Sequence, residues 1–190
     1  MAQPRYQVID RIDAGGMAEV FKAEATSMQG FQKLVAIKRV LPSLTKNQRF
    51  IRMFLDEAKV SLHLNHTNCV QVFDLGIADG TYFIVMEFIE GRDLAQLIFD
   101  DFPLSHGRII QIAKQVCLAL DEAHGAGIIH RDLKPENIMV THSRAEADLV
   151  KVLDFGISKL LDPRHADGLD MTKTGSLMGS PMYMPPEQMR

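Results

Sequence analysis

The sequence predicts an α+β protein built from two lobes, a small five-stranded antiparallel lobe with one helix and a larger, mainly helical lobe. Short strand-like runs separated by turns fill most of residues 1–90, with one helical pattern among them. A long apolar helix then opens residues 91–190. A chain of 190 residues is long enough to bury the core of two such lobes.

The predicted strands of the first lobe are short apolar or alternating runs bounded by glycine-containing turns. A turn at Ala78-Asp79-Gly80 separates the last two of them. The five strands are predicted at residues 6–12, 18–25, 34–40, 69–75 and 82–88.

The helix of the first lobe is predicted to follow Thr45-Lys46-Asn47-Gln48, which resembles a capping box. Glu57 lies three residues after Phe54, so both are expected on the inward face. The periodic positions predict about four turns. They are Phe50, Phe54, Ala58, Ser61 and Leu62.

The second region opens with a helix over residues 105–124 that is apolar on nearly every side and is therefore expected to be buried all round. Two short strands, 138–141 and 149–153, flank a polar loop, and the chain beyond Gly156 has a loop-like composition. The lobe boundary is predicted at residues 88–92, with lobes of 1–90 and 91–190.

Composition excludes several classes of protein. No run of 18 apolar residues predicts a membrane segment, and the first residues lack the apolar stretch of a signal peptide, so a cytoplasmic location is expected. A net charge of -3 without a dense Lys/Arg cluster argues against nucleic-acid binding. Cys69 and Cys117 have no CxxC spacing and are expected to be buried free thiols.

Four motifs carry the chemistry. HRDLKPEN at 130–137 is followed 17 residues later by DFG at 154–156, and VAIK at 35–38 and a glycine-bearing segment at 12–20 precede both. An Asp, an Asn five residues later and a second Asp before a Gly are the parts that phosphoryl transfer needs. In this order the motifs resemble the eukaryotic-type protein kinase family, including its bacterial serine/threonine members, over nearly the whole chain.

The resemblance implies ATP and Mg²⁺ as cofactors and proteins with Ser or Thr acceptors as substrates. Asp132 would orient the substrate hydroxyl, and Asn137 and Asp154 would hold the metal. Lys134 matches the serine/threonine pattern of the family. The residues 1–90 would then form the nucleotide-binding lobe, and 91–190 a partial lobe with the catalytic loop and activation segment.

The same resemblance assigns the nucleotide site. Lys38 and Glu57 would form the ion pair that holds the α- and β-phosphates. Val20, Ala36 and Met139 would cover the two faces of the adenine, and Met86 would form the back of its pocket. Glu87 and Phe88 would supply the hinge, and Asp93 would touch the ribose.

The phosphate-binding loop departs from the family's GxGxxGxV pattern. Gly15 matches and Gly16 adds a second flexible point, but Asp13 and Ala18 stand where the first and third glycines are expected. Asp13 would bring a negative charge toward the nucleotide unless its side chain points away. Taken alone, the segment fits a plain hairpin turn equally well.

Regulation is implied by Arg131, whose guanidinium in this family binds a phosphorylated activation-loop residue. Thr172 and Thr174 resemble an autophosphorylated TxT pair, and Ser176 is a third candidate. A kinase homodimer would allow phosphorylation in trans. Residues 179–188 resemble the closing motif GTPxYMxPEQ.

The family continues beyond Arg190 into helices that complete the large lobe. They would supply the Arg partner of Glu187, whose loss from a buried pair costs on the order of 3–5 kcal/mol. We therefore expect the 190 residues alone to be poorly soluble and weakly active. The same helices would bury Ile109, Ile112, Val116 and Leu120.

Two other functions compete with the kinase. A catalytically impaired nucleotide-binding scaffold is suggested by Asp13, Ala18 and the family's missing helices, and ATP binding without transfer would support it. A small-molecule phosphotransferase fits the Asp-to-Asn spacing but neither Lys134 nor the segment 179–187.

Overall fold

The structure is a computed structural model that describes residues 6–15, 17–27, 30–142, 147–155, 181–183 and 185–186. In the helix that follows residue 47, the side chains at 49, 53, 56, 57 and 60 lie outside the description. The chain divides into two compact units, one of residues 1–65 and 70–90, the other of residues 66–69 and 91–190.

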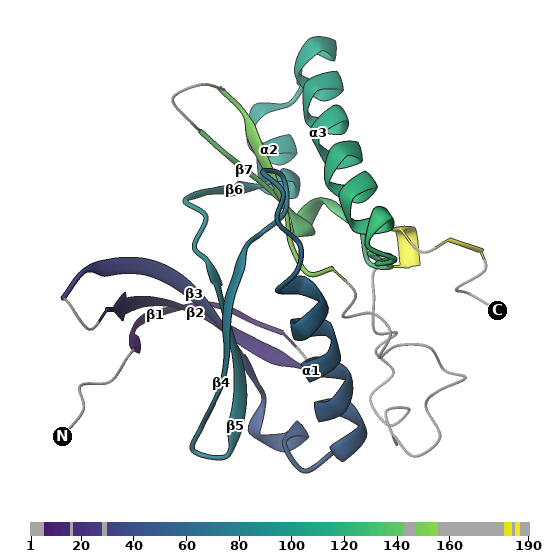
Figure 1. Cartoon of the computed structure of the whole chain (residues 1–190). Helices are drawn as coiled ribbons and strands as arrows, with labels where there is room; N and C mark the ends of the chain where they lie inside the picture. The colour runs from purple at the N-terminus through teal and green to yellow at the C-terminus, as the bar shows by residue number, and fades with distance from the viewer. Residues whose placement is uncertain are drawn as a thin grey trace. The chain divides into compact units, whose positions relative to one another are not determined.

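The first unit contains the predicted five-stranded antiparallel sheet (Figure 1). Its strands lie in the spatial order β1-β2-β3-β5-β4, so that β1 and β4 form the edges. This confirms the fold expected for the first lobe. The strands are β1 (Tyr6–Ala14), β2 (Ala18–Thr26), β3 (Gln32–Val40), β4 (Val72–Ala78) and β5 (Thr81–Glu87).

Two tight hairpins connect these strands. At the β1–β2 turn the backbone N–H of Gly15 donates to the carbonyl of Ala18 at 3.0 Å. Between β4 and β5, Asp79 and Gly80 have φ values of 50° and 72°, as a two-residue hairpin turn with positive φ at both positions requires. The predicted turn at this site is confirmed.

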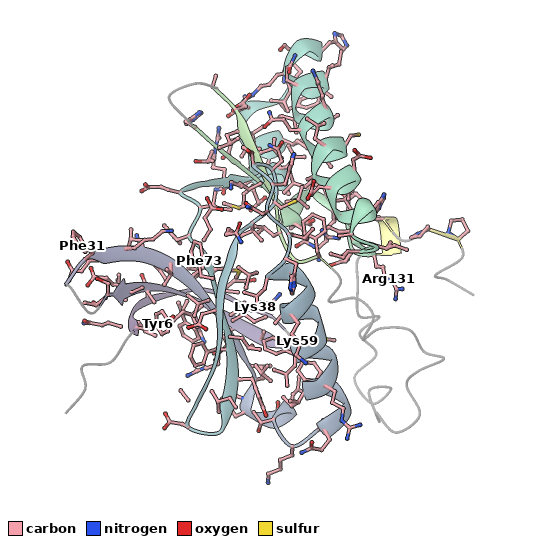
Figure 2. The ribbon with its side chains drawn as sticks, viewed as in Figure 1. Tyr6, Phe31, Lys38, Lys59, Phe73 and Arg131 are labelled. Carbon is pink, nitrogen blue, oxygen red and sulfur yellow. The ribbon has the colours of Figure 1, made fainter. Side chains whose placement is uncertain are left out.

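The sheet curls until its two edge strands meet. The hydroxyl of Tyr6 on β1 donates to Asp74 Oδ2 on β4 at 2.8 Å, and the Tyr6 ring lies edge-on to Phe83 with centroids 6.1 Å apart (Figure 2). Two register shifts in β1 permit this curvature. The enclosed face holds the buried cluster Ala23, Val35, Ile37 and Val85.

Helix α1 (Gln48–Ser61) contacts β4, and its N-cap lies two residues later than predicted. The side chain of Asn47 accepts the backbone N–H of Phe50 at 3.0 Å, which makes Asn47 the N-cap. Thr45 instead donates to the carbonyl of Pro42 at 2.7 Å, at the end of a 3₁₀ turn over Pro42–Leu44. The capping box assigned to Thr45 is therefore wrong.

The buried positions of α1 follow the predicted period only in part. Phe50, Phe54 and Ala58 are buried, as their spacing predicts. Leu62 lies beyond the last helical residue and is 37% exposed, so its assignment to the inward face is wrong.

The second unit combines a three-stranded sheet with helices. The strands predicted near residues 138–141 and 149–153 are present, and a short third strand and a helix that were not predicted precede them. The sheet order is β6-β7-β8 (Figure 1). The elements are β6 (Gly91–Asp93), α2 (Leu94–Asp101), α3 (His106–Gly125), a 3₁₀ turn (Pro135–Asn137), β7 (Ile138–Thr141), β8 (Leu149–Val152) and a 3₁₀ turn (Pro181–Tyr183).

Helix α3 has a defined signal at each end. The Ser105 hydroxyl accepts the N–H of Arg108 at 3.3 Å at the N-terminus. At the C-terminus Gly127 adopts a φ of 75°, and the N–H of Ile128 reaches back to the carbonyl of Ala123 at 2.8 Å. This is the Schellman arrangement that a glycine after a helix allows.

Only one stripe of α3 is buried, contrary to the expectation of burial all round. The stripe contacts β8, whereas Ile109, Ile110 and Leu118 are 47%, 63% and 45% exposed. Ile112 and Val116 are already buried by the described residues, so the expectation that further helices bury them is wrong. The stripe consists of Ile112, Val116, Ala119 and Ala123.

None of the described helices is long and apolar enough to be a candidate for spanning a bilayer.

The segment 66–69 belongs to the second unit although it lies between α1 and β4 in sequence. The Asn68 side chain donates to Gln115 Oε1 and to the carbonyl of Val150, both at 2.9 Å, and Cys69 forms a parallel bridge with Val152. This is why β4 begins at Val72 and not at Cys69 as predicted.

Both cysteines are free thiols, as predicted, but only one of them is buried. Burial raises the pKa of the Cys69 thiol to about 11. Cys117 on α3 is exposed, which corrects the expectation that both are buried. Neither thiol has a neighbouring cysteine with which it forms a disulfide in the structure.

Candidate active site

Asp132 lies in the loop between α3 and β7, and two side chains fix its carboxylate. Asn137 Nδ2 donates to the Asp132 carbonyl at 2.8 Å and to its Oδ2 at 3.1 Å. Lys134 Nζ lies 3.4 Å from the same Oδ2. The Asp132 side chain remains 33% exposed, so a carboxylate of fixed orientation is accessible to a hydroxyl group.

A 3₁₀ turn places Asn137 beside Asp132. Pro135 occupies its first position, where a missing N–H is tolerated, and the N–H of Asn137 donates to the carbonyl of Lys134 at 2.9 Å. The carbonyl of Asn137 accepts the N–H of Leu153 at 2.9 Å, which ties the turn to the segment after β8. Two backbone hydrogen bonds therefore hold Asn137 in place, one within the turn and one to the segment after β8.

Backbone strain marks the same region. Arg131 and Asp154 adopt φ values of 65° and 55°, in the left-handed region that side chains with a Cβ rarely enter. Such conformations cost on the order of 1–3 kcal/mol each and persist where the surroundings enforce them. Arg131 directly precedes Asp132, and Asp154 is itself a predicted metal ligand, so the strained positions coincide with the motifs.

His130 holds the loop through hydrogen bonds on both ring nitrogens. Its Nδ1 accepts the N–H of Asp132 at 3.3 Å, which leaves Nε2 to donate to the carbonyl of Leu153 at 2.8 Å. Burial lowers the pKa of His130 below its ordinary value, so the neutral ring with its proton on Nε2 fits both contacts. The ring packs on Phe155 with centroids 5.0 Å apart, which agrees with a packing role for both residues.

The two predicted metal ligands offer oxygen donors of the kind that a hard divalent cation prefers. Asn137 Nδ2 is committed to Asp132, so its amide oxygen is the atom that would bind a cation, and Asp154 would supply a carboxylate. Within the described residues no group of three or more His, Cys, Asp or Glu forms a metal site. Phosphate oxygens would therefore have to complete the coordination, as is usual for Mg²⁺ in phosphoryl-transfer enzymes.

The first unit gathers four predicted nucleotide-site residues on one face of its sheet. Val20 pairs with Lys38 across β2–β3, and Ala36 pairs with Met86 across β3–β5. Residues directly opposite each other project from the same face, and alternate residues of a strand share a face. Val20, Ala36, Lys38 and Met86 therefore project from one face.

Lys38 is only 9% exposed, although lysine is seldom buried without a partner (Figure 2). A buried ammonium requires an anionic partner or hydrogen-bond acceptors. Glu57 belongs to α1, but its side chain lies outside the described residues, and so does the predicted ion pair.

The predicted phosphate loop is the β1–β2 hairpin. The Asp13 carboxylate accepts the N–H of Ala14 at 2.8 Å, so one of its oxygens is bound locally. Ala18 is the first residue of β2, and Gly15 closes the turn. Gly16 lies outside the described residues.

The remaining pocket residues occupy strand ends. Asp93 pairs with Met139 across β6–β7, and its carboxylate also caps α2 by accepting the N–H of Gln96 at 2.8 Å. This capping role had a local signal, an Asp directly before a helical run, that the sequence reasoning missed. Glu87 ends β5, and the Phe88 ring lies 4.8 Å from the ammonium of Lys22.

Several predicted positions lie outside the described residues. The predicted phosphorylation sites Thr172, Thr174 and Ser176 are among them. Gly156, Glu187 and the motif positions Gly179, Ser180, Met184 and Gln188 lie outside the described residues as well.

The second unit also contains an ion-pair network that the sequence patterns did not predict. Arg108 binds Asp148 through Nε and Nη2 at 2.7 and 2.9 Å and Asp101 through Nη1 at 3.0 Å, and Arg92 binds Asp101 at 2.9 Å. The hydrogen bonds from Arg108 lower the pKa of Asp148 below its ordinary value. Those from Arg92 and Arg108 lower the pKa of Asp101 to about 2. Forty residues separate Arg108 from Asp148, so local sequence carries no signal of the pair.

Comparison with known proteins places this geometry in a family. A family model described as protein kinase domain matches residues 6–190. The serine/threonine-protein kinase pkn3 of Myxococcus xanthus is 47% identical over 98% of this chain and 34% of its own length, and the tyrosine-protein kinase MasK of the same species is 37% identical over 97% and 29%. The chain thus spans about a third of the length of these curated relatives.

A solved structure gives the same result at the level of the fold. The PknI kinase domain of Mycobacterium tuberculosis superposes with a TM-score of 0.67 and 31% identity, covering 83% of this chain and 62% of that one. The fold, the arrangement of the Asp132 loop and the match over residues 6–190 agree with one another. The chain belongs to the protein kinase domain family.

Proposed function

We propose that the protein is a kinase that transfers the γ-phosphoryl group of ATP to Ser or Thr hydroxyls of protein substrates. The observation that carries the proposal is the accessible Asp132 carboxylate, fixed by Asn137 at 3.1 Å and by Lys134 at 3.4 Å. A base held in one orientation within reach of solvent is what this reaction requires of the protein.

In this proposal each side chain has one task. Asp132 orients the acceptor hydroxyl and takes up its proton, and Lys134 lies beside the transferred phosphoryl group, where its positive charge offsets developing negative charge. Lys38 and Glu57 hold the α- and β-phosphates. Asn137 and Asp154 would hold Mg²⁺, whose charge neutralises phosphate oxygens.

The nucleotide would lie against the sheet face described above, with the phosphate loop at Gly15 and Gly16. Val20, Ala36 and Met139 would contact the adenine ring, and Met86 would form the back of the pocket. The hinge at Glu87 and Phe88 would bind the adenine through its backbone, and Asp93 would contact the ribose.

Ser or Thr is the proposed acceptor because Lys134 matches the serine/threonine pattern. The name of MasK shows that overall similarity alone does not choose between hydroxyl types. Phosphoamino-acid analysis of the labelled product should give phosphoserine or phosphothreonine. Phosphotyrosine as the main product would contradict this assignment.

Regulation is proposed to act through Arg131, with Thr172 and Thr174 as sites that a second copy phosphorylates in trans. Phosphopeptide mapping after incubation with ATP should locate phosphate within residues 170–180.

ATP as phosphoryl donor implies a reaction in the cytoplasm. The net charge of -3 favours protein substrates over nucleic acid as partners.

A second candidate is a nucleotide-binding scaffold without transfer, which the altered glycine loop favours. Asp13 and Ala18 replace two glycines, although Asp13 is bound to a local N–H. Under this alternative, ATP binds but no phosphate reaches a protein.

The deciding experiment is transfer of radiolabelled phosphate by the full-length protein and by its Asp132→Asn variant. We expect the substitution to reduce transfer by about 10²–10⁴-fold, the usual contribution of a positioned acid or base. ATP binding should remain unchanged. Equal incorporation by both proteins would remove Asp132 from its proposed role, and binding without any transfer would support the scaffold.

A further inference from the structure

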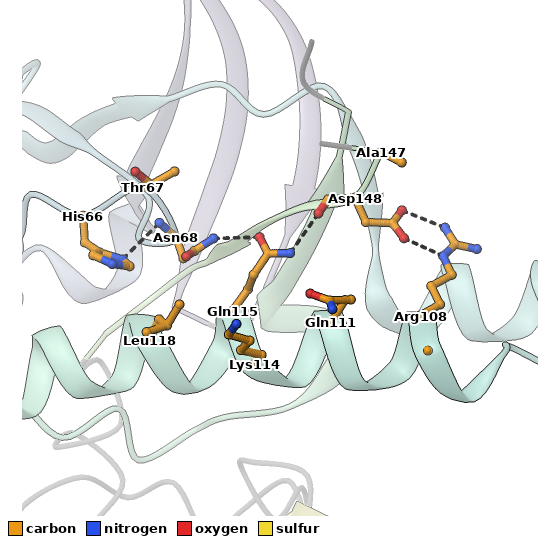
Figure 3. Close-up of a pocket in the computed structure, with 11 residues that line it drawn as sticks. His66, Thr67, Asn68, Arg108, Gln111, Lys114, Gln115, Leu118, Ala147 and Asp148 are labelled. Atoms are coloured by element: carbon orange, nitrogen blue, oxygen red, sulfur yellow. Dashed lines mark hydrogen bonds and ion pairs between the residues drawn. The ribbon is translucent and has the colours of Figure 1, made fainter. Parts of the chain in front are cut away.

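A pocket that contains none of the candidate active-site residues lies within the second unit (Figure 3). Its volume is about 670 Å³, within the range of ligand-binding pockets. Three segments line it: the loop 66–68, the α3 positions 107–118, and residues 147–148 before β8.

One wall of the pocket is held rigid by a glutamine. Gln115 Oε1 accepts from Asn68 Nδ2 at 2.9 Å, and its Nε2 donates to the carbonyl of Asp148 at 2.8 Å (Figure 3). The same Oε1 also accepts the N–H of Val150 at 2.9 Å. Asn68 is only 5% exposed. The wall is formed before any ligand arrives, which reduces the ordering cost of binding.

The charge of the pocket is unbalanced by one lysine. Arg108 and Asp148 bind each other through two hydrogen bonds of 2.7 and 2.9 Å and so neutralise each other. Lys114 projects from the same helix and lines the same pocket, yet in the described part of the chain it forms no ion pair or hydrogen bond. One positive charge therefore has no internal counterpart.

The rest of the lining adds a neutral donor and an apolar surface. His66 Nδ1 accepts the N–H of Asn68 at 3.1 Å, so the proton of the neutral ring lies on Nε2, which is a donor. Leu118 is 45% exposed on the lining. The combination suits a ligand that has a carboxylate close to an apolar group.

We propose that this pocket is a docking site for an extended acidic segment of a protein substrate. Lys114 binds a carboxylate of the segment, and an apolar side chain of the segment packs on Leu118. Nucleic acid fits less well, because Arg108 is already neutralised and a single lysine cannot replace several phosphate contacts. That the segment belongs to a substrate rests on the proposed kinase function, whereas binding of the segment to the pocket does not.

The first test measures binding without ATP. The probe is a fluorescent ten-residue peptide of alternating Glu and Leu, titrated with the full-length protein and followed by anisotropy. Lys114→Glu should weaken binding by about tenfold or more, as loss of a charge-assisted hydrogen bond predicts. Leu118→Ser should weaken it as well.

Two controls isolate the pocket. Lys46→Glu makes the same charge change at an exposed lysine before α1 and should leave the affinity unchanged. A peptide with Gln in place of Glu should bind the unaltered protein more weakly than the Glu peptide does. Its affinity should be the same for the Lys114→Glu variant and for the unaltered protein. Absence of binding by the unaltered protein, or equal loss in Lys46→Glu and Lys114→Glu, would overturn the proposal.

The same titration separates this proposal from the catalytic one. Asp132→Asn should bind the peptide normally, so failure of transfer and failure of docking are different results. A thymidine oligonucleotide is the competing probe. If it bound more tightly than the acidic peptide and depended on Lys114, the site would be a nucleic-acid site and the proposal would be wrong.

A kinetic test addresses the role in substrate selection. A short Ser-containing peptide is compared with the same peptide carrying the acidic segment. The segment should lower KM without changing kcat, and Lys114→Glu should abolish this difference while leaving the short peptide unaffected. A KM ratio that Lys114→Glu leaves unchanged would exclude the pocket from substrate docking.

Discussion

Asn137 has a larger part in positioning the Asp132 carboxylate than Lys134, because it contacts both the side chain and the backbone of Asp132. Its amide nitrogen is shared between the Asp132 carbonyl at 2.8 Å and Oδ2 at 3.1 Å. The amide oxygen is thereby directed to another ligand. One residue thus couples the orientation of the proposed base to the proposed metal site, which the five-residue spacing alone does not reveal.

His130 should make stability depend on pH. Burial lowers its pKa below the ordinary value of 6.5, so the unfolded chain takes up a proton that the folded chain does not. The free energy of unfolding should therefore decrease as pH falls below about 6.5, by at most about 1.4 kcal/mol per pH unit. Chemical denaturation between pH 7.5 and 5.5 measures this slope.

His130→Phe is the control for that slope. It keeps a ring against Phe155 but loses the hydrogen bonds to Asp132 and Leu153, so its stability at pH 7.5 should be lower. Because phenylalanine does not titrate, the pH dependence should be flatter. Every other titrating group is common to both proteins. Parallel curves for the two proteins would show that His130 does not contribute the effect.

At the scale of elements, the small sheet depends on a glycine in β6. A Cβ on Gly91 would overlap the carbonyl oxygen of Val140 in the neighbouring strand β7. Gly91→Ala should therefore force the strands apart and lower the free energy of unfolding by about 1–3 kcal/mol, the usual cost of overpacking. Thermal or chemical denaturation measures the difference.

Gly107 provides a matched substitution in α3. A Cβ there meets no atom within 4 Å. Gly107→Ala should leave stability unchanged or raise it by up to about 1 kcal/mol, because alanine favours the helix. A comparable loss at both glycines would show that general loss of glycine, and not contact with Val140, is responsible.

At the scale of the whole molecule, the segment 66–69 has a larger role than its length suggests. It leaves the first unit in sequence and joins the second through Asn68, which donates to Gln115 and to the carbonyl of Val150. The chain therefore crosses between the units more than once. Residues near position 68 contribute to a unit whose other residues come from position 91 onward.

Asn68→Ala tests that role. The substitution leaves the buried carbonyl of Val150 without this donor and should cost about 2–3 kcal/mol in the free energy of unfolding. Denaturation with a probe in α3 measures it. Asn65→Ala, at an exposed position, should change stability by less than about 0.5 kcal/mol. A small loss at Asn68 would contradict the anchoring role.

Local patterns predicted some elements well and others poorly. Alternation and turn residues indicated all five strands of the first unit, since each of these signals lies within a few residues. The cap of α1 was placed at Thr45 because Ser/Thr and Gln at capping-box spacing match a rule, yet Asn47 occupies the cap. Two caps compete there, and only the backbone geometry decides between them.

The candidate site shows the same division. The HRDLKPEN and DFG motifs indicated the chemistry and the family because phosphoryl transfer needs those residue types at those spacings. They did not indicate the strained φ of Arg131 and Asp154 or the two contacts of His130. These features arise from the fit of separate segments around the loop.

The sequence by itself therefore determined the family and the strand-rich first lobe, and it supplied the residues of the proposed site, because each of these depends on patterns of neighbouring positions. Only the tertiary structure decided the membership of segment 66–69 in the second unit, the pairing of Arg108 with Asp148 and the pocket beside Lys114. The physical reason is distance along the chain. Contacts between residues 40 or more positions apart depend on packing, which local patterns do not encode.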